Sequence, residues 1–250
     1  MVRLREFLSI IESEFPADRL TFQKAVPTFH PEGAQDAADL FRLANRHRQP
    51  IFITGFGNNI DPQGKPFTDM VAVRTDRLNQ LMEIAPDDFY VTVGAGYPLK
   101  EINAQLEHKN LWLPHSSLPY VGSVGGALAI GLAADFENQD FPLKRYFLKA
   151  EIVTPEGDIV SPGSVCFKSV SGYDVVRIFA GSWGLLGLIV SASLRVMPLS
   201  AAAEYVSARL KAADRGGLLE ALDTSSDDPD AIYSRKIKAK FDPEGVLPIV

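Results

Sequence analysis

Three clusters of glycine residues are the part of this sequence best suited to chemistry. They occupy residues 55–59 (Gly-Phe-Gly-Asn-Asn), 122–126 (Gly-Ser-Val-Gly-Gly) and 181–187 (Gly-Ser-Trp-Gly-Leu-Leu-Gly). Glycine lets a ligand approach the main chain closely, and successive amide N–H groups in such turns form a concave site for an anion. Two such loops that meet on one pyrophosphate would hold a dinucleotide without a lysine.

Two better-known phosphate-binding motifs do not fit these clusters. None of them ends in the Gly-Lys-Ser/Thr sequence of a P-loop. A Rossmann motif at the first cluster fails because Ile60 replaces the third glycine, and because residues 61–64 (Asp-Pro-Gln-Gly) prevent a helix from following. Each cluster alone is compatible with an ordinary turn, so the order and spacing of all three carry the signal.

Hydrophobic periodicity and turn residues indicate a mixture of helices and strands. We predict helices over residues 1–20, 34–47, 98–110, 174–180 and 216–223, and strands over residues 50–54, 70–73, 89–93, 147–154, 158–160, 186–196, 201–210 and 232–238. The strands and helices do not alternate strictly, as they would in a doubly wound sheet, so we predict an α+β fold.

The segment from Lys168 to Ile189 resembles a known family motif. It contains Lys-x-x-x-Gly-Tyr-Asp followed by Gly-Ser-x-Gly-x-Leu-Gly-x-Ile, which is similar to the vanillyl-alcohol-oxidase, or PCMH-type, FAD-binding flavoproteins. Within them the glycolate and D-lactate dehydrogenase group is most similar, especially the FAD-binding subunit of glycolate oxidase. The resemblance covers about residues 25–200, and residues 50–59 and 119–131 are similar to the two glycine loops of this family.

The resemblance implies a two-lobed domain with FAD extended between the lobes. Some members of the family attach the flavin to a histidine in or just after the first loop. Here that stretch reads Asn58-Asn59, so we expect non-covalent FAD. The residues implied to contact FAD are Gly55, Phe56, Gly57, Asn58, Asn59, Pro114, His115, Ser116, Ser117, Gly122, Ser123, Gly125, Gly126, Gly187 and Ile189.

We expect three parts along the chain. Residues 1–20 form an N-terminal helix, residues 21–200 the FAD-binding domain, with a small lobe to about residue 93 and a large lobe after it, and residues 201–250 a short remnant of the substrate or cap region. Residues 241–248 resemble the C-terminal Phe-Asp-Pro-x-Gly motif of the family. The resemblance therefore implies a chain whose middle is drastically shortened.

No catalytic residue can be assigned from the sequence. His30, His47 and His108 are expected at the surface, whereas His115 lies in the segment that should approach the flavin. In related single-chain dehydrogenases a large substrate domain supplies the histidine and carboxylate groups that bind substrate, whereas here only about fifty residues follow Pro198 and they contain no histidine.

Composition restricts the possible partners and the compartment. The formal net charge of −6 argues against a nucleic-acid partner. The single cysteine cannot build an iron–sulfur centre, so such a centre would lie on a partner. The N-terminus lacks a signal peptide, and no apolar run could insert directly into a membrane. We expect a cytoplasmic protein with no metal site of its own, which reaches a membrane only through partners.

Two functions remain open. The first is an oxidoreductase subunit that oxidises a small 2-hydroxy acid such as glycolate, together with a larger flavoprotein subunit and an iron–sulfur subunit. The second is a non-catalytic flavin-binding module for assembly or electron relay, without a substrate site. A more distant alternative on the same fold is an enzyme that reduces UDP-sugars or oxidises alditols.

Overall fold

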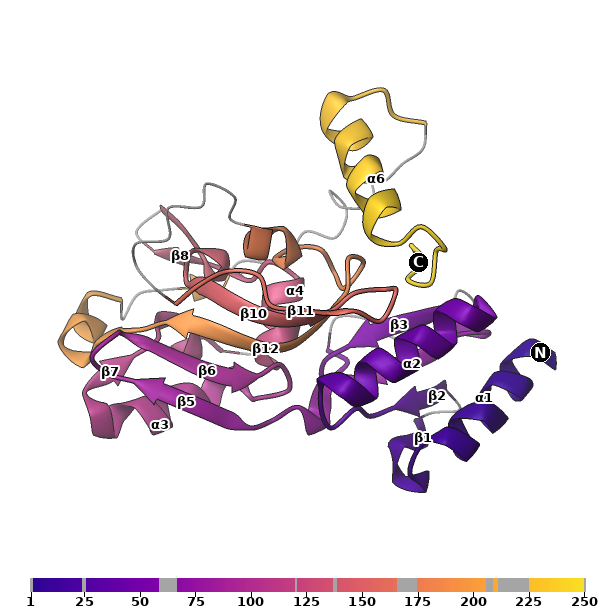
Figure 1. The fold of residues 1–250 in the computed structure, drawn as a ribbon. Helices are drawn as coiled ribbons and strands as arrows, with labels where there is room; N and C mark the ends of the chain where they lie inside the picture. The colour runs from indigo at the N-terminus through magenta and orange to yellow at the C-terminus, as the bar shows by residue number, and fades with distance from the viewer. Residues whose placement is uncertain are drawn as a thin grey trace.

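Two β-sheets and the helices around them form the body of the protein (Figure 1). The computed structural model describes residues 2–23, 26–58, 67–119, 121–136, 139–165, 175–205, 209–210 and 225–249. The predicted α+β class is confirmed.

The first sheet has the strand order β1-β2-β4-β3. It consists of β1 (Leu20–Gln23), β2 (Val26–Phe29), β4 (Val71–Arg74) and β3 (Ile51–Thr54). β2, β4 and β3 are parallel, and β1 pairs antiparallel with β2. The carboxyl ends of the parallel strands therefore meet at one edge, and β3 leads from this edge directly into Gly55.

Helix α2 (Ala34–His47) connects this sheet to the rest of the molecule. Its apolar residues recur at helical spacing, and Leu40, Phe41 and Ala44 on that face are completely buried. They share a core with Val153 and Leu188 of the second sheet. The helix ends at Arg48, whose left-handed conformation lets its amide donate to the carbonyl groups of the last turn. Helix α1 (Val2–Glu14) adds Phe7 and Ile11 to the same core and ends before Pro16.

The second sheet is antiparallel, with the order β11-β10-β12-β6-β5. Its strands are β5 (Leu81–Ala85), β6 (Tyr90–Gly94), β10 (Phe147–Val153), β11 (Ile159–Val160) and β12 (Leu188–Arg195). β12 lies in the centre and buries every residue except Arg195. Because β5 and β6 pair within this sheet, the two sheets separate between Arg74 and Leu81, earlier than the lobe boundary near residue 93 that the sequence suggests.

Short elements complete the larger lobe. Its helices are α3 (Ile102–Leu106) and α4 (Val124–Ala129). The small sheets pair β7 (Leu111–Trp112) with β13 (Met197–Pro198), and β8 (Ala133–Phe136) with β9 (Gln139–Pro142) and β14 (Arg209–Leu210). The 3₁₀ helices of the described residues, counting those of both lobes, are η1 (Ala17–Arg19), η3 (Thr75–Arg77), η4 (Leu99–Glu101), η5 (Glu107–Lys109), η6 (Pro114–Ser117), η7 (Leu143–Arg145), η8 (Val175–Phe179) and η9 (Leu199–Tyr205).

The C-terminal region differs from the sequence prediction. The strand predicted over residues 232–238 is wrong, because these residues belong to helix α6 (Pro229–Phe241). The Asp228 side chain caps this helix by accepting from the Asp230 amide, and Pro229 occupies its first turn. The single long strand predicted over residues 201–210 is also wrong, because residues 201–205 belong to η9; residues 209–210 form β14. The helix predicted over residues 216–223 lies outside the described residues.

Helix α6 stands away from both sheets, but the segment after it returns to the first sheet (Figure 1). We call residues 242–247 the C-terminal hook. The carboxylate of buried Asp242 accepts hydrogen bonds from the amides of Val246 and Leu247, at 2.8 and 2.9 Å. The Val246 carbonyl in turn accepts from the Ile51 amide at 2.9 Å. The hook is thus fixed to the first residue of β3.

The expected surface position of His30 is wrong. His30 follows β2 and is 4% exposed. Its Nε2 lies 2.8 Å from Thr21 Oγ1, and its Nδ1 lies 2.7 Å from Asp76 Oδ1. The imidazole is buried because both ring nitrogens have polar partners at the sheet edge, which compensates for their loss of water.

Candidate functional site

The first two glycine clusters meet in space, although about seventy residues separate them in the sequence. A Cβ atom at Gly55 would lie 2.6 Å from Ser123 Oγ and 3.6 Å from Gly126 Cα. A Cβ atom at Gly122 would lie 3.5 Å from Asn58 Nδ2. The Ser123 hydroxyl leaves no room for a side chain at Gly55, and the two loops lie directly against each other.

Ser123 fixes the local conformation of the second loop. It is the N-cap of α4, and its Oγ accepts a hydrogen bond from the Gly126 amide at 3.1 Å. The Gly125 amide donates to the Ala95 carbonyl at 2.7 Å, just after β6 ends. A Cβ atom at Gly125 would lie 2.7 Å from the Ala95 Cβ. The second loop is therefore held tightly against the end of the larger sheet.

The open part of the site is at Gly57. This residue has φ +80° and is exposed, and a Cβ atom there would meet no atom within 4 Å. Successive amide groups point towards a common anion where a right-handed residue is followed by a left-handed one, or in a turn, and Gly57 supplies a left-handed residue here. Residues 55–58 and 121–126 contain no acidic side chain that would repel a phosphate. The composition of the two loops is therefore compatible with a bound diphosphate. Asn59, which is also predicted to contact FAD, lies outside the described residues.

The third glycine cluster serves packing in this structure. A Cβ atom at Gly184 would lie 3.1 Å from the Ile53 Cβ, and one at Gly187 would lie 2.7 Å from the Val153 carbonyl oxygen. Ile189 is buried and pairs with Ile152 across β12 and β10. The cluster brings β12 close to β10 and to β3. Contact of Gly187 and Ile189 with a cofactor stays a prediction.

Helix η6 contains the four residues predicted to line the path to the flavin. Pro114, His115 and Ser116 are buried, whereas Ser117 is exposed. Ser116 Oγ accepts from the Asn103 amide at 3.2 Å, and Ser117 Oγ accepts from Asn103 Nδ2 at 3.0 Å. The serine hydroxyl groups thus attach η6 to α3, and their contact with a cofactor also stays a prediction.

His115 is a buried, neutral imidazole. Its side chain is inaccessible to solvent, and burial lowers its pKa to about 4, against the opposing effect of a hydrogen bond to the Phe141 carbonyl. Nε2 lies 3.0 Å from that carbonyl oxygen and therefore carries the proton. Nδ1 is buried without a hydrogen-bond partner among the described residues.

His115 packs between two aromatic rings. The Phe141 ring stacks on the imidazole with ring centroids 5.1 Å apart, and the Tyr146 ring meets it edge-on, also at 5.1 Å. Phe141 and Tyr146 contact each other at 5.3 Å. We call His115, Phe141 and Tyr146 the three-ring cluster. It connects η6 to β9 and to the start of β10.

Sequence reasoning missed Asn103, which holds the segment before η6. Its Oδ1 accepts from the Leu113 amide at 2.8 Å, and its Nδ2 donates to the Leu113 carbonyl at 3.1 Å. The Asn103 side chain thus satisfies both the N–H and the carbonyl of Leu113, as the backbone of a neighbouring strand would. An asparagine within a predicted helix carries no sequence signal for this role.

The described ranges contain neither a cluster of metal-ligating side chains nor a membrane-spanning helix. No group of three or more His, Cys, Asp or Glu side chains in these ranges could hold a metal ion. No helix in them is both long enough and apolar enough to cross a membrane.

Comparison with known proteins identifies one matching family model and several relatives. The model, described as "FAD binding domain", matches residues 27–163. The D-lactate dehydrogenase of Archaeoglobus fulgidus is 25% identical over 205 residues, which cover 77% of this chain and 46% of that protein. The glycolate oxidase subunit GlcE of Escherichia coli is 31% identical over 155 residues, which cover 60% of this chain and 43% of that protein.

A second glycolate oxidase subunit and a solved structure are also similar. GlcD of Bacillus subtilis is 26% identical over 170 residues, which cover 67% of this chain and 36% of that protein. An alkyldihydroxyacetonephosphate synthase structure superimposes with a TM-score of 0.63 at 18% identity, covering 78% of this chain and 40% of that one. This structural likeness shows the fold. The chain spans less than half the length of each of these proteins.

Proposed function

Because the chain belongs to the FAD-binding domain family, we propose that it is the FAD-binding subunit of an oxidoreductase complex that oxidises a small 2-hydroxy acid such as glycolate. FAD is its cofactor. One observation carries the proposal: Gly55 and Gly126 converge on Ser123, beside the open turn at Gly57. This surface offers main-chain amides to a diphosphate and excludes side chains from it.

The substrate class and the complex come from the relatives. D-lactate dehydrogenase is named for a 2-hydroxy acid, and two glycolate oxidase proteins are named as subunits. The three sequences match this chain over 60–77% of its length. We therefore propose that the chain acts beside a larger flavoprotein subunit. An iron–sulfur subunit as electron acceptor is a further part of this proposal, which the relatives' names do not support.

The residues of this chain bind and orient the cofactor in this proposal. The amides of residues 55–58 and of Gly122 and Ser123 hold the two phosphates, and no covalent bond is needed. The amides of Gly125 and Gly126 instead donate to Ala95 and Ser123 and hold the second loop in place. Charge-assisted hydrogen bonds of this kind contribute about 1.5–3 kcal/mol each. FAD when bound supplies the two-electron acceptor for oxidation of the acid. The neutral His115 keeps η6 packed against Phe141 without adding a charge near the flavin path.

His115, the histidine in the segment predicted to line the flavin path, is inaccessible to solvent and its Nε2 already donates to the Phe141 carbonyl. A histidine is the commonest general base at neutral pH, and a base is needed to remove the hydroxyl proton of a 2-hydroxy acid. This observation favours the second candidate function, an assembly or electron-relay module whose flavin is reduced by a partner subunit.

Retention of FAD tests the diphosphate cradle. Gly57→Val places a side chain in the open turn, and we expect the purified variant to lose most of its FAD. Gly245→Val is a matched control, because Gly245 also has positive φ (+66°) and would also place its Cβ with no atom within 4 Å. Both variants carry the same backbone strain, of about 1–2 kcal/mol or more. Full FAD content in Gly57→Val would contradict the proposed cradle.

Two further measurements separate the candidate functions. Acid precipitation of the yellow protein should release all the flavin into the supernatant, because the cofactor is not covalently attached. Anaerobic addition of glycolate or D-lactate to the isolated chain then tests for a complete active site. Bleaching of the flavin without a partner would rule out the relay module, whereas bleaching only after addition of the larger subunit would support it.

A further inference from the structure

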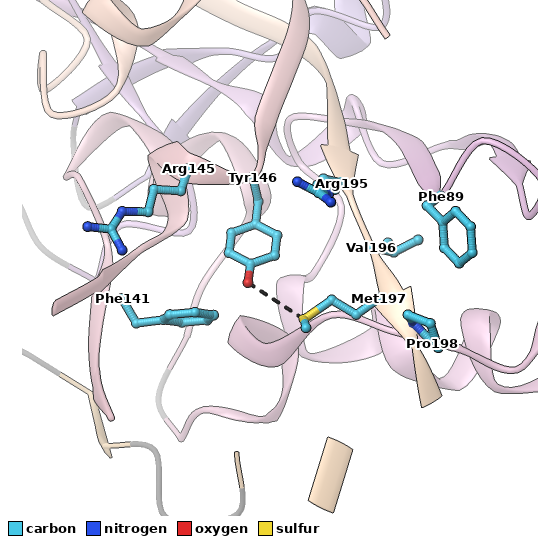
Figure 2. Close-up of a pocket in the computed structure, with 8 residues that line it drawn as sticks. All are labelled: Phe89, Phe141, Arg145, Tyr146, Arg195, Val196, Met197 and Pro198. Carbon is cyan, nitrogen blue, oxygen red and sulfur yellow. Dashed lines mark hydrogen bonds between the residues drawn. The ribbon is translucent and has the colours of Figure 1, made fainter. Parts of the chain in front are cut away.

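A cavity of about 500 Å³ opens at the carboxyl end of β12 (Figure 2). Ligand pockets in proteins usually have volumes of about 300–1,000 Å³ and mainly apolar walls. Aromatic, apolar and basic side chains share this lining. The described lining residues are Phe89, Phe141, Arg145, Tyr146, Arg195, Val196, Met197 and Pro198.

This cavity is separate from the diphosphate cradle. Gly187 directly precedes β12, whereas Arg195 is its last residue. The eight residues of the strand span about 25 Å, so the third glycine cluster and the cavity lie at opposite ends of the central strand. The second loop of the cradle packs on Ala95, whose amide donates to the Val190 carbonyl. Val190 lies five residues before Arg195, which corresponds to about 17 Å along the strand. A ligand in the cavity would therefore depend on different residues from those that hold the phosphates of FAD.

The charge of the lining points to an anionic ligand. The described lining residues include two arginines and no acidic residue, in a chain whose formal net charge is −6. Arg145 and Arg195 are both exposed and lie on opposite sides of the Tyr146 ring (Figure 2). A guanidinium group matches a carboxylate with two parallel hydrogen bonds, so either side of the ring can hold an acid group.

The remaining walls fit an apolar body that carries a polar group. Phe141 and Tyr146 belong to the three-ring cluster, which His115 supports from η6. The Tyr146 hydroxyl donates to Met197 Sδ at 3.6 Å. A thioether sulfur is a weak acceptor, so a ligand oxygen would be a stronger partner for this hydroxyl. Met197 is flexible enough to move aside for it.

Backbone hydrogen bonds keep the rim of the cavity in place. The Arg195 amide donates to the Tyr146 carbonyl at 2.7 Å, and the Val196 amide donates to the Phe89 carbonyl at 2.9 Å. These bonds connect β12 to both of its neighbours at the cavity. A preformed rim lowers the conformational cost of binding.

We infer that this cavity binds a small organic acid, whose carboxylate pairs with Arg145 or Arg195 and whose body packs on Phe141 and Tyr146. The expectation that this ligand is a 2-hydroxy acid rests on the proposed function. The inference that a carboxylate binds here rests on the cavity alone.

Isothermal titration of the FAD-loaded chain with 3-phenyllactate tests this inference. The probe combines a carboxylate, a 2-hydroxyl group and an aromatic body, and 3-phenyllactamide is its uncharged counterpart. We expect the amide to bind at least about tenfold more weakly than the acid, because a charge-assisted bond is lost. Arg145→Gln or Arg195→Gln should weaken phenyllactate by a similar factor, and the double variant should bind it least.

Arg5→Gln is the matched control, because Arg5 is also exposed but lies on α1 in the other lobe. Its affinity for phenyllactate should equal that of the wild type, and all variants should keep their FAD content. Equal binding of acid and amide, or unchanged affinity in the double variant, would overturn the inference. Loss of FAD in the Gly57→Val variant with retained phenyllactate binding would leave the inference intact, so failure of the cradle and failure of the cavity are distinguishable.

Discussion

Replacing His115 by glutamine should remove a defined part of the acid sensitivity of the fold. His115 has a pKa of about 4 in the folded protein because it is buried, against 6.5 for an exposed imidazole. Below about pH 6.5 the unfolded chain therefore takes up a proton at this residue, whereas the folded chain does not until about pH 4. Stability is thus lost as the pH falls through this window.

The size of the effect follows from the two pKa values. The difference between 6.5 and about 4 corresponds to about 3 kcal/mol when both states are protonated. Between pH 7 and pH 5 only the unfolded state titrates appreciably, and the expected loss is about 2 kcal/mol. Glutamine cannot titrate, but its amide can still donate to the Phe141 carbonyl.

Urea unfolding at pH 7 and pH 5 measures this loss. The wild type should lose about 2 kcal/mol more than His115→Gln between the two pH values. His108→Gln is the matched control, because His108 is exposed, and it should behave like the wild type. Equal pH dependence in the wild type and in His115→Gln would refute the reasoning, because it would mean that the buried imidazole is protonated or accessible in the folded state.

Three further substitutions test individual contacts by urea unfolding. Asn103→Ala removes three side-chain hydrogen bonds to the segment around η6 and should cost about 2–3 kcal/mol; a cost below about 0.5 kcal/mol would contradict this role. Gly125→Ala places a Cβ 2.7 Å from Ala95 and should destabilise by about 1–3 kcal/mol through overpacking, whereas a neutral effect would mean that α4 can move freely. Asp242→Ala leaves Lys238 and two hook amides without their acceptor, for a loss of about 3 kcal/mol or more; near-wild-type stability would exclude a structural role for the hook.

Elements with a strong local pattern could be predicted from the sequence. The predicted helix at residues 34–47 is α2 with the same bounds, because its apolar residues recur along one face. The predicted strand at residues 186–196 contains β12, whose burial is nearly continuous. The resemblance to PCMH-type flavoproteins is confirmed by the family match and by the fold of the solved structure.

Elements that depend on tertiary contacts could not be predicted in the same way. The strand predicted over residues 232–238 is wrong because the Asp228-Pro229 cap starts a helix just before them. The helix predicted over residues 98–110 is divided into η4, α3 and η5. Gly96 approaches the Thr75 carbonyl near the start of this segment, which no local pattern reveals.

The candidate site was predictable in its residue types but not in its arrangement. The glycine clusters are visible in the sequence, whereas the contact between Gly55 and Ser123 depends on how two sheets pack. The lining of the cavity joins Phe89, Phe141 and Met197, which are more than fifty residues apart from one another in the chain. Such a combination has no signature in a single sequence.

The C-terminal hook completes the hydrogen bonding of β3 from a distant part of the sequence. Its Val246 carbonyl binds the first residue of β3, and this four-residue strand ends at the first glycine loop. Residues 51 and 246 are therefore joined directly, so a small sheet whose other strand pairings are nearer in the sequence also depends on a contact between the two distant ends of the described chain.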